Sequence, residues 1–136
     1  MTPDEVRAFV AANHRAVLIT RSTDDRLQTS PVTVGVGDRG EIVISSRETA
    51  YKVRNLRRDP RATLCIFTDA FFGQWVQVDG AADILSLPEA MEPLVEYYRA
   101  IRGEHPDWDD YRSVMEREKR LLIRVPVERV GPTRMG

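Results

Sequence analysis

The sequence predicts a mainly β domain, a small antiparallel barrel with flanking helices. Three observations carry this prediction. Apolar, β-branched runs alternate with short turn-forming segments through the first 85 residues. The early runs lie too close together for the crossover connections that a parallel sheet needs. Helical periodicity then dominates until a last apolar run returns near the C-terminus. At 136 residues, the chain is one domain, 1–136.

Six strands are expected in this barrel, at 16–22, 27–36, 41–46, 62–68, 74–85 and 120–125. The second strand alternates at Val32, Val34 and Val36, and Pro31 indicates an edge or a bulge within it. Gly80 allows a bend in the long fifth strand. A loop is expected at 69–73, and a Gly/Pro tail from Gly131.

The helices are predicted from their end signals. Thr2, Pro3 and Glu5 form a capping box for a first helix that ends at Asn13-His14. A second helix covers 49–58 and stops before Asp59-Pro60. Ser86 and Glu89 form a second capping box before an apolar stripe, and Asp107 caps a last helix. The stripe comprises Leu87, Met91, Leu94, Tyr98 and Ile101, and we interpret it as core or dimer packing.

Composition excludes several classes of protein. No apolar run is long enough to span a membrane, and the acidic N-terminus has no signal core, which together predict a cytoplasmic protein. Cys65 is the single cysteine, so an internal disulfide and a cysteine-built metal site are excluded. Because Leu64 and Ile66 flank it, Cys65 is expected to be a buried, inert thiol.

The side chains contain no recognisable catalytic set, and no catalytic residue is assigned. His14 and His105 are not arranged as in HExxH, and no metal site is predicted. His105 is expected to be a solvated turn residue, and Asp109-Asp110 to be helix-start charge. A nucleophile elbow, a P-loop and a GxGxxG motif are also missing from the sequence. If the protein is an enzyme, a cofactor supplies the chemistry.

The most informative segment carries a concentrated positive charge. The chain as a whole has a net charge of −1, whereas 47–61 holds six cations and two anions, a local charge of +4. A strand there runs into a helix start with the hydroxyls of Ser45, Ser46 and Thr49, and Lys52 follows one turn later. Free N–H groups at such a start favour an anion, and a phosphate ester fits. An ordinary solvated basic helix remains the alternative.

This segment also resembles a family. The residues SSRETAYKVRNLRRDPRA at 45–62, preceded by Gln28-Thr29-Ser30-Pro31-Val32, resemble the pyridoxamine 5′-phosphate oxidase-like FMN-binding split β-barrels. The segment Gly103–Met115 is similar to the actinobacterial branch that uses the deazaflavin coenzyme F-420. The resemblance extends over roughly Val6 to Val130 and implies a six-stranded split barrel.

The resemblance implies a homodimer with two cofactors in clefts at the subunit interface, and it assigns roles to residues. Residues expected near the cofactor phosphate are Ser45, Ser46, Arg47, Thr49, Lys52 and Asn55. Residues expected along the ring are Gln28, Ser30, Pro31 and Val32, and Trp75 and Gln77 lie on the strand that reaches toward the partner's cofactor. Ala50 departs from relatives that have a second basic residue, for which Arg47 or Arg54 could substitute.

Each assignment has a simpler alternative. Gln28 and Ser30 could face solvent, and Trp75 could pack in the core or a dimer contact. The remaining arginines of the segment are either a solvated face or a contact for a polyglutamate-tailed coenzyme; they are Arg57, Arg58 and Arg61.

The function expected from the resemblance is that of a deazaflavin (F-420)-dependent oxidoreductase, acting as a reductase on an unidentified electron-poor small molecule. An FMN-dependent oxidase or flavin reductase, and a non-catalytic coenzyme-binding protein, are the alternatives. Nucleic-acid binding is disfavoured because the chain is net acidic and lacks basic strands with interleaved aromatic residues.

Overall fold

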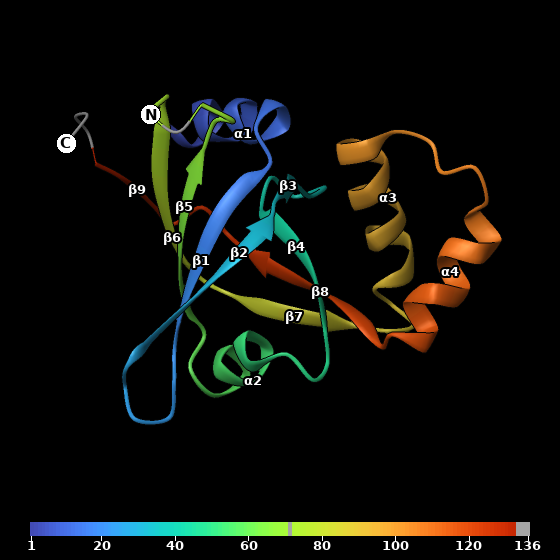
Figure 1. Ribbon diagram of the computed structural model, residues 1–136. Coiled ribbons are helices and arrows are strands. Elements are labelled where there is room, and N and C mark those ends of the chain that lie inside the picture. Colours follow the sequence, from blue (N-terminus) through green and yellow to red (C-terminus); the bar gives the residue numbers. More distant parts are fainter. Residues whose placement is uncertain (71, 133–136) are drawn as a thin grey trace.

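The computed structural model describes residues 1–70 and 72–132, and within them the chain forms a split antiparallel barrel with helices at its ends and side (Figure 1). Phe71, in the predicted loop at 69–73, and the end of the predicted tail lie outside the described residues. The helices are α1 (Pro3–Ala12), α2 (Tyr51–Arg58), α3 (Met91–Arg102) and α4 (Trp108–Arg117). The strands are β1 (Arg15–Arg21), β2 (Leu27–Thr33), β3 (Gly35–Val36), β4 (Ile42–Arg47), β5 (Arg61–Phe67), β6 (Trp75–Ala81), β7 (Asp83–Ser86), β8 (Arg120–Val125) and β9 (Arg129–Gly131).

Two sheets make the barrel. The five-stranded sheet has the order β2-β1-β5-β6-β9, and the four-stranded sheet has the order β3-β4-β8-β7. Every pairing in both sheets is antiparallel, which confirms the predicted architecture. Pro31 lies in β2, at the edge of the five-stranded sheet, as predicted.

The strand count differs from the predicted six because two predicted strands each serve both sheets. The segment 27–36 divides at Val34 into β2 and β3, and 74–85 divides at Ala82 into β6 and β7. A strand that crosses between sheets must leave one ladder before it joins the next, although its alternation continues through the corner. β9 was not predicted; it pairs with β6 through Gln77–Asp79, so Gly131 belongs to a strand and not to a tail.

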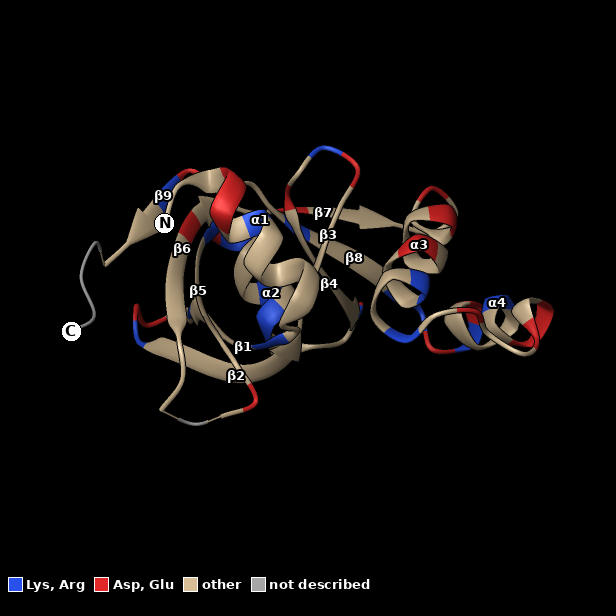
Figure 2. Ribbon diagram, turned by 90° about the horizontal axis from the view of Figure 1, so that it is seen from above, with Lys and Arg blue, Asp and Glu red and all other residues tan. Residues whose placement is uncertain are grey.

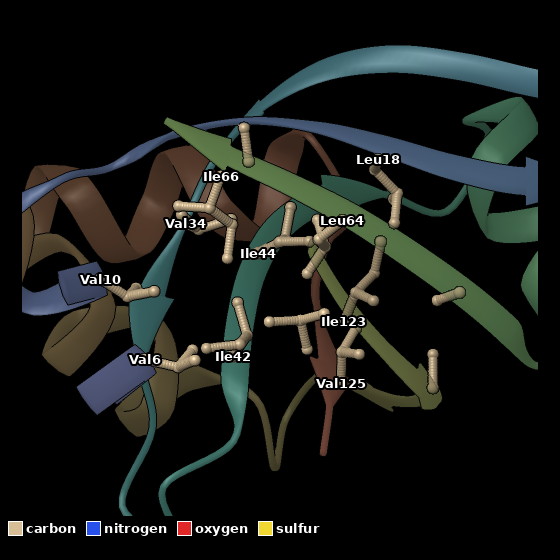
Figure 3. Packing of buried hydrophobic residues seen from close by; sticks show 14 of the residues in the cluster. Val6, Val10, Leu18, Val34, Ile42, Ile44, Leu64, Ile66, Ile123 and Val125 are labelled. Carbon is tan, nitrogen blue, oxygen red and sulfur yellow. The ribbon is translucent and has the colours of Figure 1, made fainter. Parts of the chain in front are cut away.

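The barrel interior is filled by the inward side chains of both sheets (Figure 3). Ile44 and Ile123 of the four-stranded sheet pack with Leu64 and Ile66 of β5, and each is at most 1% exposed. The two short helices close the barrel at opposite ends (Figure 1). Their contributions to this core are Val6, Phe9 and Val10 from α1, and Val53 and Leu56 from α2.

A second apolar cluster holds α3 and α4 beside the barrel (Figure 2). Val43 of β4 and Leu122 of β8 point away from the interior and pack against Leu94 and Val95 of α3 and Met115 of α4. The four-stranded sheet is therefore covered on its outer face, next to the end of β4, and this places the helical pair beside the predicted phosphate segment.

Two of the three predicted caps are confirmed. Thr2 and Glu5 form the capping box of α1, and the Asp107 side chain accepts a hydrogen bond from the Asp110 N–H at the start of α4. The predicted box at Ser86 is wrong. Ser86 is extended in β7, where its hydroxyl donates to Glu48 Oε1 at 2.7 Å, so it cannot cap a helix, and α3 begins only at Met91.

The expectation of a buried Cys65 is also wrong. Leu64 and Ile66 point into the barrel, and the alternation of β5 therefore places Cys65 on the outer face of the five-stranded sheet, where it is partly exposed. Partial burial raises the pKa of its thiol, which keeps it protonated at neutral pH. None of the described helices has the length and apolar character needed to cross a membrane.

Candidate coenzyme cleft

A cleft of about 930 Å³ lies between the barrel and the helical pair. Its barrel side is formed by the end of β2, the end of β4 and the start of α2. The start of β8, which is paired with β4, also lies on this barrel side, and the opposite wall is formed by α3 and α4. The predicted phosphate segment thus opens into this cleft.

The end of β4 delivers three predicted residues to this cleft. Alternation turns Ser45 toward the helical pair and leaves Ser46 only 4% exposed on the barrel side, while Arg47 is exposed at the strand end. Pairing with β8 fixes this register, with Ser45 opposite Leu122 and Arg47 opposite Arg120. The hydroxyls therefore stand on the part of β4 that is paired with β8, beyond the β3 pairing, which ends at Val43.

The start of α2 is left without a side-chain cap. The helix begins at Tyr51, two residues later than predicted, and Thr49 does not cap it. Ala50 occupies the N-cap position and has no side chain that could accept a hydrogen bond from the first turn. Unsatisfied N–H groups and the positive end of the helix consequently face the cleft beside Thr49 and Lys52, an arrangement suited to an anion.

Lys52 is a partly buried cation without a counter-ion. Its Nζ lies 3.5 Å from the Ser30 hydroxyl, and no carboxylate among the described residues forms an ion pair with it. Burial, with a contribution from the charge of Arg120, lowers the pKa of Lys52. Partial burial makes the charged form of Lys52 more costly in the absence of a partner, so this position is suited to an anion.

The second cation of the cleft is Arg120, which sequence reasoning missed. Arg120 and Arg47 share the carboxylate of Glu118, at 2.8 and 3.3 Å respectively. Arg54, one of the two residues expected to replace the missing basic side chain at Ala50, lies over the Tyr51 ring and does not line the cleft. Arg120 belongs to a strand 68 residues after Lys52, and no local pattern connects the two.

Gln28 and Asn55 lie behind the cleft and bind each other. The Asn55 amide donates to Gln28 Oε1 at 2.7 Å and to the Thr20 hydroxyl at 3.1 Å, and Asn55 is only 6% exposed. Arg58 donates to Asn55 Oδ1 at 3.3 Å. Gln28 therefore does not face solvent, and both side chains tie α2 to the five-stranded sheet without lining the cleft. Pro31 and Val32 of the same strand do line it.

Trp75 and Gln77 lie outside the cleft, on the five-stranded sheet. Both are on β6 and point to the outer face of the five-stranded sheet, opposite to the buried Val76 and Val78. The Gln77 amide donates to Asp79 Oδ2 at 3.2 Å. Neither residue lines the cleft of its own chain, so their predicted role depends on a second copy and stays a prediction.

The helical wall was not predicted as part of the site. Leu94 of the apolar stripe packs on the sheet, as expected for core, but Tyr98 and Ile101 line the cleft. His105 lies partly exposed in the connection between α3 and α4, and its ring also packs 5.1 Å from Tyr98 and 5.6 Å from both Trp108 and Tyr111. The distinctive segment at 103–115 therefore has a structural role, because it holds α4 against α3.

This geometry defines a class of protein, a split barrel with a cleft lined by cations between its sheet and a helical pair. The chain belongs to the pyridoxamine 5′-phosphate oxidase family, whose model matches residues 2–133. Members of this family have a flavin-binding fold.

Three solved structures show how widely the fold is shared. The conserved hypothetical protein Rv2991 from Mycobacterium tuberculosis is 25% identical with a TM-score of 0.78, over 100% of this chain and 91% of that one. An F420 reductase is 15% identical with a TM-score of 0.70, over 92% of this chain and 94% of that one. A heme binding protein from Mycobacterium smegmatis is 22% identical with a TM-score of 0.73, over 100% of this chain but only 57% of that one. The last two likenesses concern the fold alone.

Proposed function

We propose that the protein is a deazaflavin (F-420)-dependent reductase that holds its coenzyme by the phosphate in this cleft and reduces an electron-poor organic acceptor. The observation that carries the proposal is Lys52, a partly buried cation without a counter-ion among the described residues, beside an uncapped helix start and the hydroxyls of Ser45 and Thr49. This donor set suits a phosphate ester, because amides, hydroxyls and an ammonium group all donate hydrogen bonds.

The chain's own residues would bind and orient the coenzyme. Lys52, Ser45 and Thr49 hold the phosphate, and Pro31 and Val32 offer an apolar strand surface for the ring. When bound, a reduced deazaflavin supplies a hydride. The barrel and the helical wall limit the access of water between them. The Tyr97 and Tyr111 hydroxyls both donate to backbone carbonyls, of Thr33 and Leu94, so neither is assigned as a proton donor.

The assembly proposed with this function is a homodimer with the coenzyme at the subunit interface. The outer face of the five-stranded sheet supports it, since Val17, Cys65, Phe67 and Trp75 are apolar there and only partly covered. Trp75 and Gln77 of one copy would then approach the coenzyme of the other. Sedimentation of the purified protein tests this, and a monomer at the concentration that binds coenzyme would contradict it.

Titration of deazaflavin and of FMN into the coenzyme-free protein tests the proposed function. We expect Lys52→Ala to weaken deazaflavin binding by about 1.5–3 kcal/mol, roughly 10- to 150-fold, because a charge-assisted hydrogen bond is lost. Lys52→Arg should restore part of the affinity. Lys119 is the other lysine of the chain and does not line the cleft, so Lys119→Ala is the matched control and should bind normally.

Three results would redirect the proposal. An unchanged dissociation constant in Lys52→Ala places the phosphate elsewhere. Tight FMN binding without measurable deazaflavin affinity favours the FMN-dependent oxidase or flavin reductase. Deazaflavin binding without turnover of any enone, quinone, nitro compound or tetrapyrrole favours a coenzyme carrier.

A further inference from the structure

The wall of the cleft opposite the phosphate site carries a single side chain suited to bind a second anion. Four cations and one carboxylate line the cleft, a net charge of +3; the carboxylate is Glu118 and the cations are Arg47, Lys52, Arg102 and Arg120. Glu118 neutralises part of the charge of Arg47 and Arg120. Arg102, in the last turn of α3, forms no ion pair or hydrogen bond with any described residue.

The surroundings of Arg102 are apolar and aromatic. On α3, Tyr98 and Arg102 are one helical turn apart, and Ile101 lies beside them on the cleft side. On α4, Val114 and Met115 continue the same wall. The wall therefore offers a ligand extensive apolar contact and one directed charge.

The aromatic side chains of this helical pair pack against one another. The rings of Tyr98, Trp108 and Tyr111 pack with centroid distances of 5.1–5.7 Å, and the Arg99 guanidinium lies 5.0 Å from the centre of the Trp108 ring. Tyr111 is further held by its hydrogen bond to the Leu94 carbonyl at 2.9 Å. A preformed wall selects a flat, stiff partner, because little entropy is lost in fitting one to the other.

We propose that Arg102 and the α3–α4 wall form an acceptor subsite, in which a flat conjugated acceptor lies against the aromatic residues and its carboxylate binds the Arg102 guanidinium. The proposal rests on the proposed function and names its substrate class, a conjugated carboxylic acid. A guanidinium with free donors suits the two oxygens of a carboxylate. The carboxylate that binds Arg102 could instead be a glutamate-type carboxylate of the coenzyme, and the test separates an acceptor carboxylate from a coenzyme carboxylate.

The test uses anthraquinone-2-carboxylate and its methyl ester, which share a flat, electron-poor body and differ by one charge. Their binding to the coenzyme-free protein is measured by titration calorimetry at constant ionic strength in a phosphate-free buffer, and Lys52→Ala excludes binding of the acid at Lys52. Because no coenzyme is needed, the result does not depend on whether deazaflavin binding is confirmed. We expect the wild-type protein to bind the acid about tenfold or more tightly than the ester.

Arg102→Gln should remove this preference, lowering affinity for the acid about tenfold and leaving the ester unchanged. Arg117→Gln is the matched control, since Arg117 is also exposed, in the last turn of α4, but does not line the cleft. Arg117→Gln and Lys52→Ala should both retain the preference for the acid over the ester. Any of three results would overturn the proposal. The wild-type protein could bind acid and ester equally, it could bind neither, or Arg102→Gln could lose affinity for deazaflavin but not for the acid.

Discussion

The replacement of Asn55 by alanine separates a structural role from a role in coenzyme binding. Family resemblance places Asn55 near the coenzyme phosphate, whereas the structure buries its amide against Gln28 and Thr20. We expect Asn55→Ala to destabilise the fold and to leave coenzyme affinity within about twofold of wild type.

The magnitude follows from the hydrogen bonds that are lost. Asn55 donates at 2.7 and 3.1 Å, and each such bond contributes a net 0.5–1.5 kcal/mol, roughly. The variant also leaves Gln28 Oε1 with one remaining donor, the Thr20 hydroxyl at 3.3 Å. We therefore expect the free energy of unfolding to fall by about 2–3 kcal/mol, which for a domain of this size lowers Tm by roughly 6–12 °C.

Urea unfolding followed by tryptophan fluorescence measures this change, with the midpoint lowered and the m-value unchanged. Arg58→Ala is the control, because it removes the exposed donor to Asn55 Oδ1 and the bond to the Arg21 carbonyl without touching the buried amide. We expect that variant to lose less than about 1 kcal/mol. A loss below about 0.5 kcal/mol in Asn55→Ala, together with coenzyme binding weakened tenfold, would refute the structural assignment.

Three further predictions concern pH and packing. Binding of inorganic phosphate in the cleft should weaken as pH rises through the pKa of Lys52, which is lowered from its usual 10.5, because only the ammonium form attracts phosphate. In Lys52→Arg, phosphate affinity measured by titration calorimetry should stay constant over the same pH range. Burial raises the pKa of Tyr111 to about 12, so the folded state keeps a proton that the unfolded chain loses near pH 10. The free energy of unfolding should therefore fall by up to about 3 kcal/mol between pH 10 and 12. Tyr111→Phe should remove that slope in urea midpoints while losing about 1 kcal/mol at pH 7, and an unchanged slope would contradict the assignment. Gly80→Ala would place a Cβ 2.0 Å from the Pro126 carbonyl oxygen and should cost about 2–3 kcal/mol in thermal unfolding. Gly131→Ala meets no atom of the described residues within 4 Å and should be neutral.

Local chemistry in the sequence was enough to predict the parts of the site that are contiguous in the chain. The hydroxyls at 45–49 and Lys52 come together because one strand leads directly into one helix, and short-range geometry fixes their spacing. The capping residues Thr2 and Asp107 were predicted for the same reason, since each acts on a backbone group three residues away.

The sequence by itself thus determined the type of each main element, the antiparallel architecture and the segment that brings Ser45, Thr49 and Lys52 together. Tertiary structure alone decided that 27–36 and 74–85 each cross between sheets, that Asn55 binds Gln28, and that Arg102 and Arg120 face the same cleft as Lys52. Alternation and helical periodicity describe which face of an element is apolar, and they are properties of neighbours in the chain. Which faces meet depends on packing between segments far apart in sequence, and it is this packing that places Arg102 in the same cleft as Lys52.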